Sequence, residues 1–113
     1  MDALTDKITG SAIEVHTILG CGLLESIYEE ALCVELERQV SVDVIYKGTT
    51  IKGQRLDLLV EKQVIVELKS VSLLPAVALA QVLSYLKATG LKRALLLNFG
   101  EKRMVDGIRR ISN

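Results

Sequence analysis

The chain has 113 residues, the size of one domain, and we expect a single domain over residues 1–113. Hydrophobic residues make up 50% and charged residues 25% of the chain, which excludes a disordered protein. Fourteen basic residues balance fourteen acidic ones, so the net charge indicates no nucleic-acid or membrane partner. Aromatic residues amount to 4%, which argues against an aromatic platform for stacking bases.

The charges are unevenly distributed along the chain. Residues 1–40 contain eight acidic and two basic residues, whereas residues 85–113 contain seven basic and two acidic ones. This pattern fits two alternatives. The protein has two solvated faces of opposite charge, or its basic C-terminal segment binds along a phosphate backbone. The two cysteines lack disulfide or metal-ligand spacing, and neither a signal peptide nor an uninterrupted apolar span is evident. We therefore expect a cytoplasmic protein with free thiols and no membrane contact.

Two helices are expected first. The segment that ends at Gly20 has apolar residues at helical spacing, namely Leu4, Ile8, Ala12, Val15 and Leu19. A second helix is expected over residues 24–36. Turns at Lys47-Gly48 and Lys52-Gly53 then separate extended segments at 42–46, 54–60 and 63–68. Glu61-Lys62 links the last two as an antiparallel hairpin, wider than two residues because Glu-Lys is not a favoured type I′ turn.

A βαβ unit is expected next. Pro75 can begin a helix because its missing N–H costs nothing there, and Gly90 ends it; its apolar composition on nearly every side predicts a buried helix. Residues 93–99 lack alternation, which is typical of a central strand covered on both faces. Residues 104–111 predict a weaker strand or a short helix. The fold class is therefore α/β, with a small mixed β-sheet flanked by helices.

Charged residues occupy two of the expected strands. Because strand side chains alternate between faces, Glu67 and Lys69 share one face, as do Arg55 and Asp57 on the preceding strand. If the hairpin aligns Asp57 with Glu67, two carboxylates and one ammonium converge on one patch. Oxygen ligands from two strands suit Mg²⁺, and a neighbouring lysine can orient or help to deprotonate an attacking water. Cross-strand ion pairs, Asp57 with Lys69 or Glu67 with Arg55, are the structural alternative.

Two helical residues are candidates to extend this patch. Glu25 lies on the apolar flank of the second helix, where a carboxylate needs a partner, although Glu35 falls in the same arc. Gln81 belongs, with Ser84 and Tyr85, to the only polar strip of the last predicted helix. That strip either approaches the patch or faces solvent, and the spacing leaves both open.

A set of short motifs runs through nearly the whole chain. The most specific is Gly22-Leu-Leu-Glu25-Ser-Ile-Tyr28. The others are His16-Thr-Ile-Leu-Gly20, Tyr46-Lys-Gly48, Arg55-Leu-Asp57-Leu-Leu-Val60, Val64-Ile-Val-Glu67-Leu-Lys69-Ser70, Gln81-Val-Leu-Ser-Tyr85-Leu-Lys87-Ala-Thr-Gly90, Leu97-Asn98-Phe99 and Asp106-Gly-Ile-Arg-Arg110. Taken together, these segments resemble the GxxExxY family of the PD-(D/E)XK nuclease superfamily.

The resemblance implies a restriction-endonuclease-like core with a nuclease-type site. By motif position, it implies Asp57 and Glu67 as metal carboxylates and Lys69 as the catalytic lysine. It also implies Glu25 as the acid of the first motif and Gln81 as the polar residue of the following helix.

We expect Mg²⁺ or Mn²⁺ as the bound ion, with a nearby backbone carbonyl such as that of Leu68 as an additional ligand. The chain departs from its relatives in two places. They usually carry a longer stretch, with an extra strand, where this chain has residues 36–42. They also often place a His or an acid where this chain has Ala78-Leu79-Ala80, so a supplementary ligand is missing there.

We therefore expect a metal-dependent, nuclease-like protein that hydrolyses phosphodiester bonds of nucleic acid, with DNA as the first candidate. The alternative is a non-catalytic interaction module of the same fold that acts through self-association or a protein partner, since fold does not fix function. A short, neutral, aromatic-poor chain offers little dedicated DNA-binding surface, which favours the alternative or a homo-oligomer.

Three further residues have ordinary explanations. His16, the only histidine, is expected to pack rather than to act as a base. Tyr28 either hydrogen-bonds Glu25 or is a core tyrosine with a satisfied hydroxyl. Cys33 is expected on the outer side of the second helix.

Overall fold

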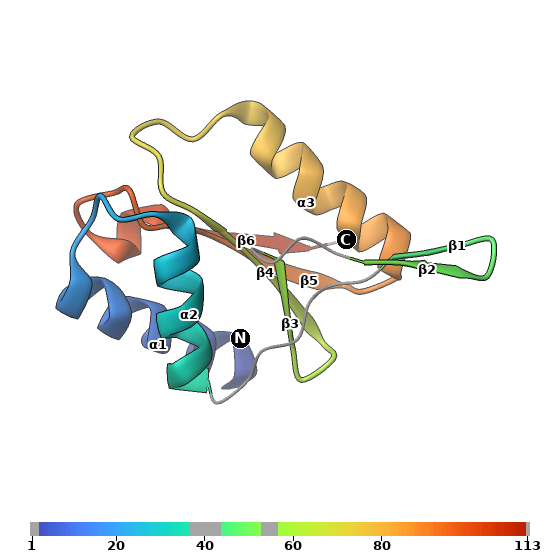
Figure 1. The fold of residues 1–113 in the computed structure, drawn as a ribbon, viewed down its shortest axis with the longest axis horizontal. Helices are drawn as coiled ribbons and strands as arrows, with labels where there is room; N and C mark the ends of the chain where they lie inside the picture. The colour runs from blue at the N-terminus through green and yellow to red at the C-terminus, as the bar shows by residue number, and fades with distance from the viewer. Residues whose placement is uncertain (1–2, 37–43, 53–56, 113) are drawn as a thin grey trace.

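A computed structural model of the protein describes residues 3–36, 44–52 and 57–112, and for Asp57 the backbone alone. In chain order the elements are α1 (Ala3–Leu19), α2 (Glu25–Leu36), β1 (Val44–Tyr46), β2 (Thr49–Ile51), β3 (Asp57–Val60), β4 (Val64–Lys69), α3 (Ala76–Thr89), β5 (Arg93–Asn98), the 3-10 helix η1 (Met104–Gly107) and β6 (Ile108–Ser112). They form three layers, with α1 and α2 on one side of a sheet and α3 on the other (Figure 1).

The main sheet has the strand order β3-β4-β5-β6. The two outer pairings are antiparallel, whereas β4 and β5 run parallel and are connected through α3. This confirms the predicted α/β class, the small mixed sheet and the βαβ unit. The last segment contains both predicted alternatives, since η1 leads directly into β6. β1 and β2 form a separate two-stranded hairpin.

The β3–β4 hairpin is wider than a two-residue turn, as predicted. Val60 pairs with Val64, so three residues connect the strands, and the Gln63 N–H donates to the Val60 carbonyl at 3.0 Å. Glu61 and Lys62 both have positive φ angles, of 50° and 61°. This turn fixes the register of the two strands that carry the charged candidates. The predicted strand residues 42–43 and 54–56 lie outside the described part of the chain.

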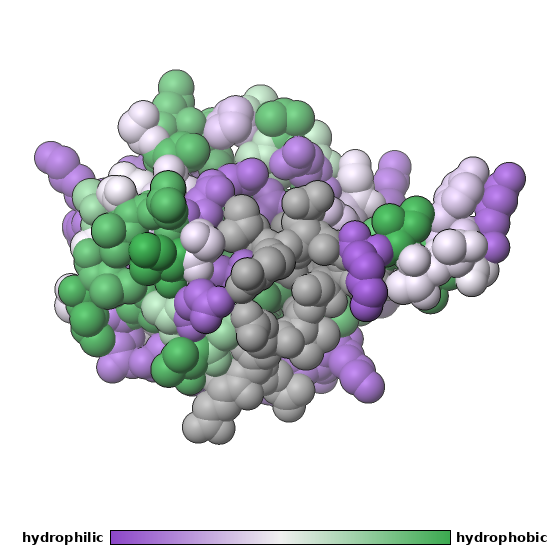
Figure 2. All heavy atoms as spheres, viewed as in Figure 1, coloured by the Kyte–Doolittle hydropathy of each residue, from purple (hydrophilic) through white to green (hydrophobic). Residues whose placement is uncertain are grey.

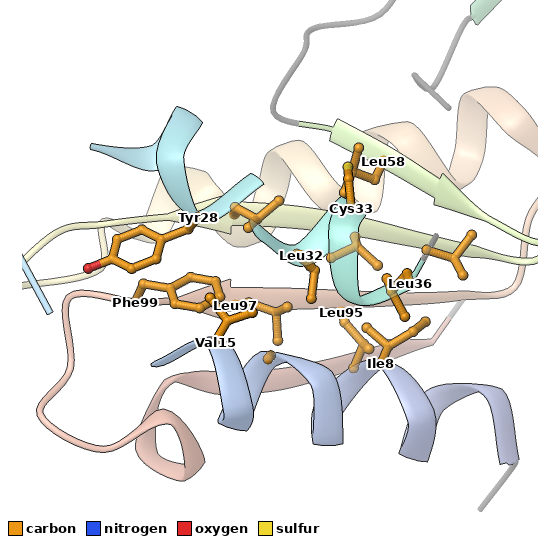
Figure 3. Packing of buried hydrophobic residues seen from close by; sticks show 14 of the residues in the cluster. Ile8, Val15, Tyr28, Leu32, Cys33, Leu36, Leu58, Leu95, Leu97 and Phe99 are labelled. Atoms are coloured by element: carbon orange, nitrogen blue, oxygen red, sulfur yellow. The ribbon is translucent and has the colours of Figure 1, made fainter. Parts of the chain in front are cut away.

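The larger core lies between the sheet and the α1–α2 pair, where apolar side chains from both helices meet those of β3, β4 and β5 (Figure 3). The Tyr28 ring stacks on Phe99 with centroids 4.3 Å apart. Cys33 belongs to this core. Its predicted outer position is therefore wrong, because α2 turns this flank towards the sheet.

The helix α3 covers the opposite face of the sheet and is buried on one side only. Gly90 ends it as predicted, with a φ of 74° and its N–H donating to the Leu86 carbonyl at 2.9 Å. The prediction that this helix is buried is wrong, because α3 forms the outermost layer and leaves Leu79 and Leu83 37% and 45% exposed. Its buried residues are Ala78, Val82 and Leu86. Among the described helices, none has the length and apolar content that a membrane crossing requires.

Candidate active site

Strand β4 carries two of the predicted site residues on the face covered by α3. Because side chains alternate along the strand, Val64, Val66 and Leu68 point into the core between the sheet and the helices α1 and α2. Glu67 and Lys69 therefore point to the opposite face. The Glu67 side chain is 5% exposed and that of Lys69 26%, and Lys69 Nζ lies 3.7 Å from Glu67 Oε2.

The sheet register places Asp57 directly opposite Glu67, which confirms the alignment that the sequence left conditional. The side chain of Asp57 is outside the described structure. Across the sheet, Glu67 also pairs with Leu96 on β5, and Leu96 pairs with Arg109 on β6. Arg55, invoked in the ion-pair alternative, lies outside the described residues.

A pocket of about 690 Å³ opens between β4, β1 and α3. Glu67, Lys69 and Gln81 line it together, with Ser84 and Tyr85 on the same flank of α3. The polar strip of α3 therefore approaches the charged patch, while Gln81 remains exposed to solvent. The remaining lining residues are Val44, Leu68, Val77, Ala80 and Ala88.

Leu68 contributes to this pocket through its backbone. Its side chain belongs to the core on the other face of the sheet, so the atoms that it presents on the α3 side are main-chain atoms. Leu68, whose backbone carbonyl is the expected additional metal ligand, therefore lines the same pocket as Glu67.

Glu25 lies in a different place from Glu67. It begins α2 and lines a separate groove with Ser70 and Gly22. Its Oε1 accepts a hydrogen bond of 3.3 Å from the Ser70 N–H, and Ser70 Oγ donates to the Leu23 carbonyl at 2.7 Å. Glu25 therefore anchors the residue that follows Lys69 and does not itself line the Glu67 pocket.

Asn98 is a structural determinant of this region that the pattern analysis missed. It pairs with Lys69 across the parallel strands and is 2% exposed. Its Oδ1 accepts hydrogen bonds from the Val71 and Gly100 N–H groups at 3.1 and 3.0 Å, and its Nδ2 donates to the Val71 carbonyl at 3.0 Å. The amide thereby fixes the loop that leaves β4. A polar residue that directly follows the apolar run at residues 94–97 of β5 was the available signal.

His16 and Tyr28 have structural roles. His16 Nε2 lies 2.7 Å from the Glu101 carbonyl oxygen, so this histidine packs as predicted. The Tyr28 hydroxyl donates to the Gly20 carbonyl at 2.6 Å and accepts from the Leu23 N–H at 3.1 Å. This supports the core-tyrosine alternative. The most buried acid of α2 is Glu29, which the helical pattern did not single out.

The C-terminal basic residues do not share one face. Arg109 pairs with Leu96, which packs against α3, whereas Arg110 pairs with Leu95 of the other core. Alternation along β6 therefore points these two arginines to opposite faces. A continuous phosphate-following strip along β6 is thus not formed.

A mixed four-stranded sheet between two helical layers, with an acid and a lysine on one central strand, is consistent with a small restriction-endonuclease-like α/β fold. The model of the PD-(D/E)XK nuclease superfamily matches residues 2–111 of the chain. The chain therefore belongs to this superfamily, and its fold is nuclease-like. No curated protein and no solved structure matches it.

Proposed function

We propose that the protein is a metal-dependent phosphodiester hydrolase that acts on nucleic acid, with DNA as the first substrate to test. The observation that carries the proposal is the shared pocket of Glu67, Lys69 and Gln81, with Asp57 opposite Glu67 in the register. The segments around Gly22–Tyr28 support a finer assignment to the GxxExxY group of the superfamily.

The donor set around Glu67 fits a hard divalent cation. Asp57, Glu67 and the Leu68 carbonyl would supply oxygen ligands, and Mg²⁺ takes one or two carboxylates while keeping several waters. Among the described side chains, which do not include that of Asp57, no group of three or more His, Cys, Asp or Glu could hold a metal. A Mg²⁺ or Mn²⁺ site of this type does not require one. When bound, the ion supplies Lewis-acid stabilisation of a phosphate and activation of water.

The remaining residues have roles set by their positions. Lys69 is half-buried beside Glu67, where its ammonium can orient a water and stabilise negative charge on a phosphate. Gln81 faces the same pocket from α3 and can donate to a phosphate oxygen. Glu25 acts as a positioning residue, because it holds the backbone of Ser70 directly after Lys69.

Metal binding tests the site directly. Isothermal titration with Mn²⁺ should show binding to the wild-type protein and a clear loss in Glu67→Gln, which keeps the size of the side chain and removes its charge. Unchanged Mn²⁺ affinity in Glu67→Gln would contradict the proposed ligand set.

Cleavage of a plasmid and of short duplex and single-stranded DNA in Mg²⁺ or Mn²⁺ tests the activity. Lys69→Ala should lower the rate by about 10²-fold or more. Lys92→Ala is the matched control, because Lys92 is an exposed lysine that precedes β5, at the end of the parallel strands away from Lys69. Activity that survives in both Lys69→Ala and Asp57→Ala would reject the assignment.

An apolar surface favours a second candidate function, a non-catalytic interaction module. Ile18 and Leu24 are 72% and 74% exposed at the turn between α1 and α2, and Ile27 lies close by in sequence. Figure 2 shows apolar side chains gathered at this end of the molecule, and such patches commonly mark protein contacts. The Lys69–Glu67 ion pair would then be structural. This candidate predicts no Mn²⁺ binding and a dimer in sedimentation that Leu24→Glu converts to a monomer.

A further inference from the structure

The β1–β2 hairpin is a short, tightly turned arm beside the candidate active site. Its strands pair as Val44 with Ile51 and Tyr46 with Thr49, so only Lys47 and Gly48 form the turn. Both turn residues have positive φ angles, of 49° and 79°, as two-residue type I′ turns require. The arm extends away from the main sheet (Figure 1).

One face of this arm continues the wall of the Glu67 pocket. Val44 lines the pocket with Glu67 and Lys69. Because alternate strand residues share a face, Tyr46 lies on the same face as Val44, two residues further along the arm. Tyr46 is 59% exposed. A strand of substrate that leaves the pocket along β1 would therefore meet the Tyr46 ring.

The side chains of the arm suit a polyanion with planar groups. Residues 44–52 include Lys47 and Lys52 and no acidic residue. The Lys47 ammonium lies over the Tyr46 ring, 5.5 Å from its centroid, so a positive charge sits on one face of the ring and a base would stack on the other face. Of the four aromatic residues of the chain, all of them described, Tyr46 alone is exposed. A single ring cannot form a platform, but it is sufficient for one base.

We infer that the β1–β2 arm binds single-stranded nucleic acid, stacking one unpaired base on Tyr46 and pairing the adjacent phosphate with Lys47. The inference rests on the proposed function and specifies its substrate as a strand with unpaired bases. An exposed aromatic ring next to a cation is the combination used to hold single strands without sequence preference. A two-stranded hairpin is marginally stable alone, so the pocket wall and a bound strand are the contacts that would hold it.

Fluorescence anisotropy of the full chain in EDTA, with labelled oligo-dT as the probe, tests the arm. Tyr46→Ala should weaken oligo-dT binding about tenfold, whereas Tyr46→Phe keeps the ring and should retain the affinity. Ile45→Ala is the matched control, because Ile45 is also exposed but lies on the opposite face of β1. Lys47→Gln should reduce the slope of log affinity against log salt by about 0.7.

Three outcomes would contradict the proposed role of the arm. Tyr46→Ala could bind oligo-dT with wild-type affinity, or Tyr46→Ala and Ile45→Ala could lose the same amount of affinity. Tyr46→Ala could also lose as much affinity for a DNA duplex of the same length as for oligo-dT. If Tyr46→Ala converts a dimer to a monomer without altering oligo-dT affinity, the arm is a subunit contact, and the proposed nucleic-acid binding is also contradicted. Mn²⁺ titration separates this from the proposed function. Intact Glu67-dependent Mn²⁺ binding with unchanged oligo-dT affinity in Tyr46→Ala rejects the arm alone, whereas a Tyr46-dependent affinity without Mn²⁺ binding rejects the hydrolase alone.

Discussion

Replacing Asn98 by alanine should destabilise the fold more than any exposed substitution. The change removes three hydrogen bonds between 3.0 and 3.1 Å that hold Val71 and Gly100. Each such bond contributes about 1 kcal/mol net, and stranded backbone partners add to the loss, so we expect a decrease of roughly 2–4 kcal/mol in unfolding free energy. Because Val71 lies two residues after Lys69, the same change should loosen the end of β4.

Urea unfolding followed by circular dichroism measures this loss as a lower midpoint with an unchanged m-value. Thr17→Ala is the control, because it removes an exposed hydrogen bond of 2.7 Å within α1 and should cost less than about 0.5 kcal/mol. If Asn98→Ala were as stable as Thr17→Ala, the Asn98 amide would not stabilise the loop after β4, and the role assigned to it would be wrong.

Two glycines give opposite predictions. In Gly107→Ala the new Cβ would lie 2.3 Å from the Asn98 carbonyl oxygen, so a loss of about 1–3 kcal/mol is expected. Gly10→Ala, in α1 with open space around it, should gain about 0.5–1 kcal/mol; equal effects in urea unfolding would contradict the packing. The pKa of Glu35 is raised by a side-chain hydrogen bond with Glu14, by desolvation and by the negative charge of Glu14. Because the pKa of Glu35 is higher in the folded than in the unfolded chain, the unfolding free energy should fall as pH rises from the ordinary glutamate pKa through the raised one. Glu35→Gln should flatten that part of the pH profile, and an unchanged profile would argue against the pair.

Local patterns were sufficient to predict most elements and part of the site. Gly90 marked the end of α3 because a left-handed residue stops a helix there. Glu67 and Lys69 could be placed on one face from strand alternation alone. The burial of α3 could not be predicted, because its apolar composition does not reveal that nothing in the described chain covers its outer side.

Residue spacing on its own thus determined where each candidate side chain points relative to its own helix or strand. The three-dimensional packing decided which of them meet. The three-residue turn after Val60 set Asp57 opposite Glu67, the seating of α3 brought Gln81 into the pocket, and the start of α2 carried Glu25 to another groove. The physical reason is that backbone geometry fixes direction within an element over a few residues, whereas contact between elements depends on register and on core packing across the whole chain.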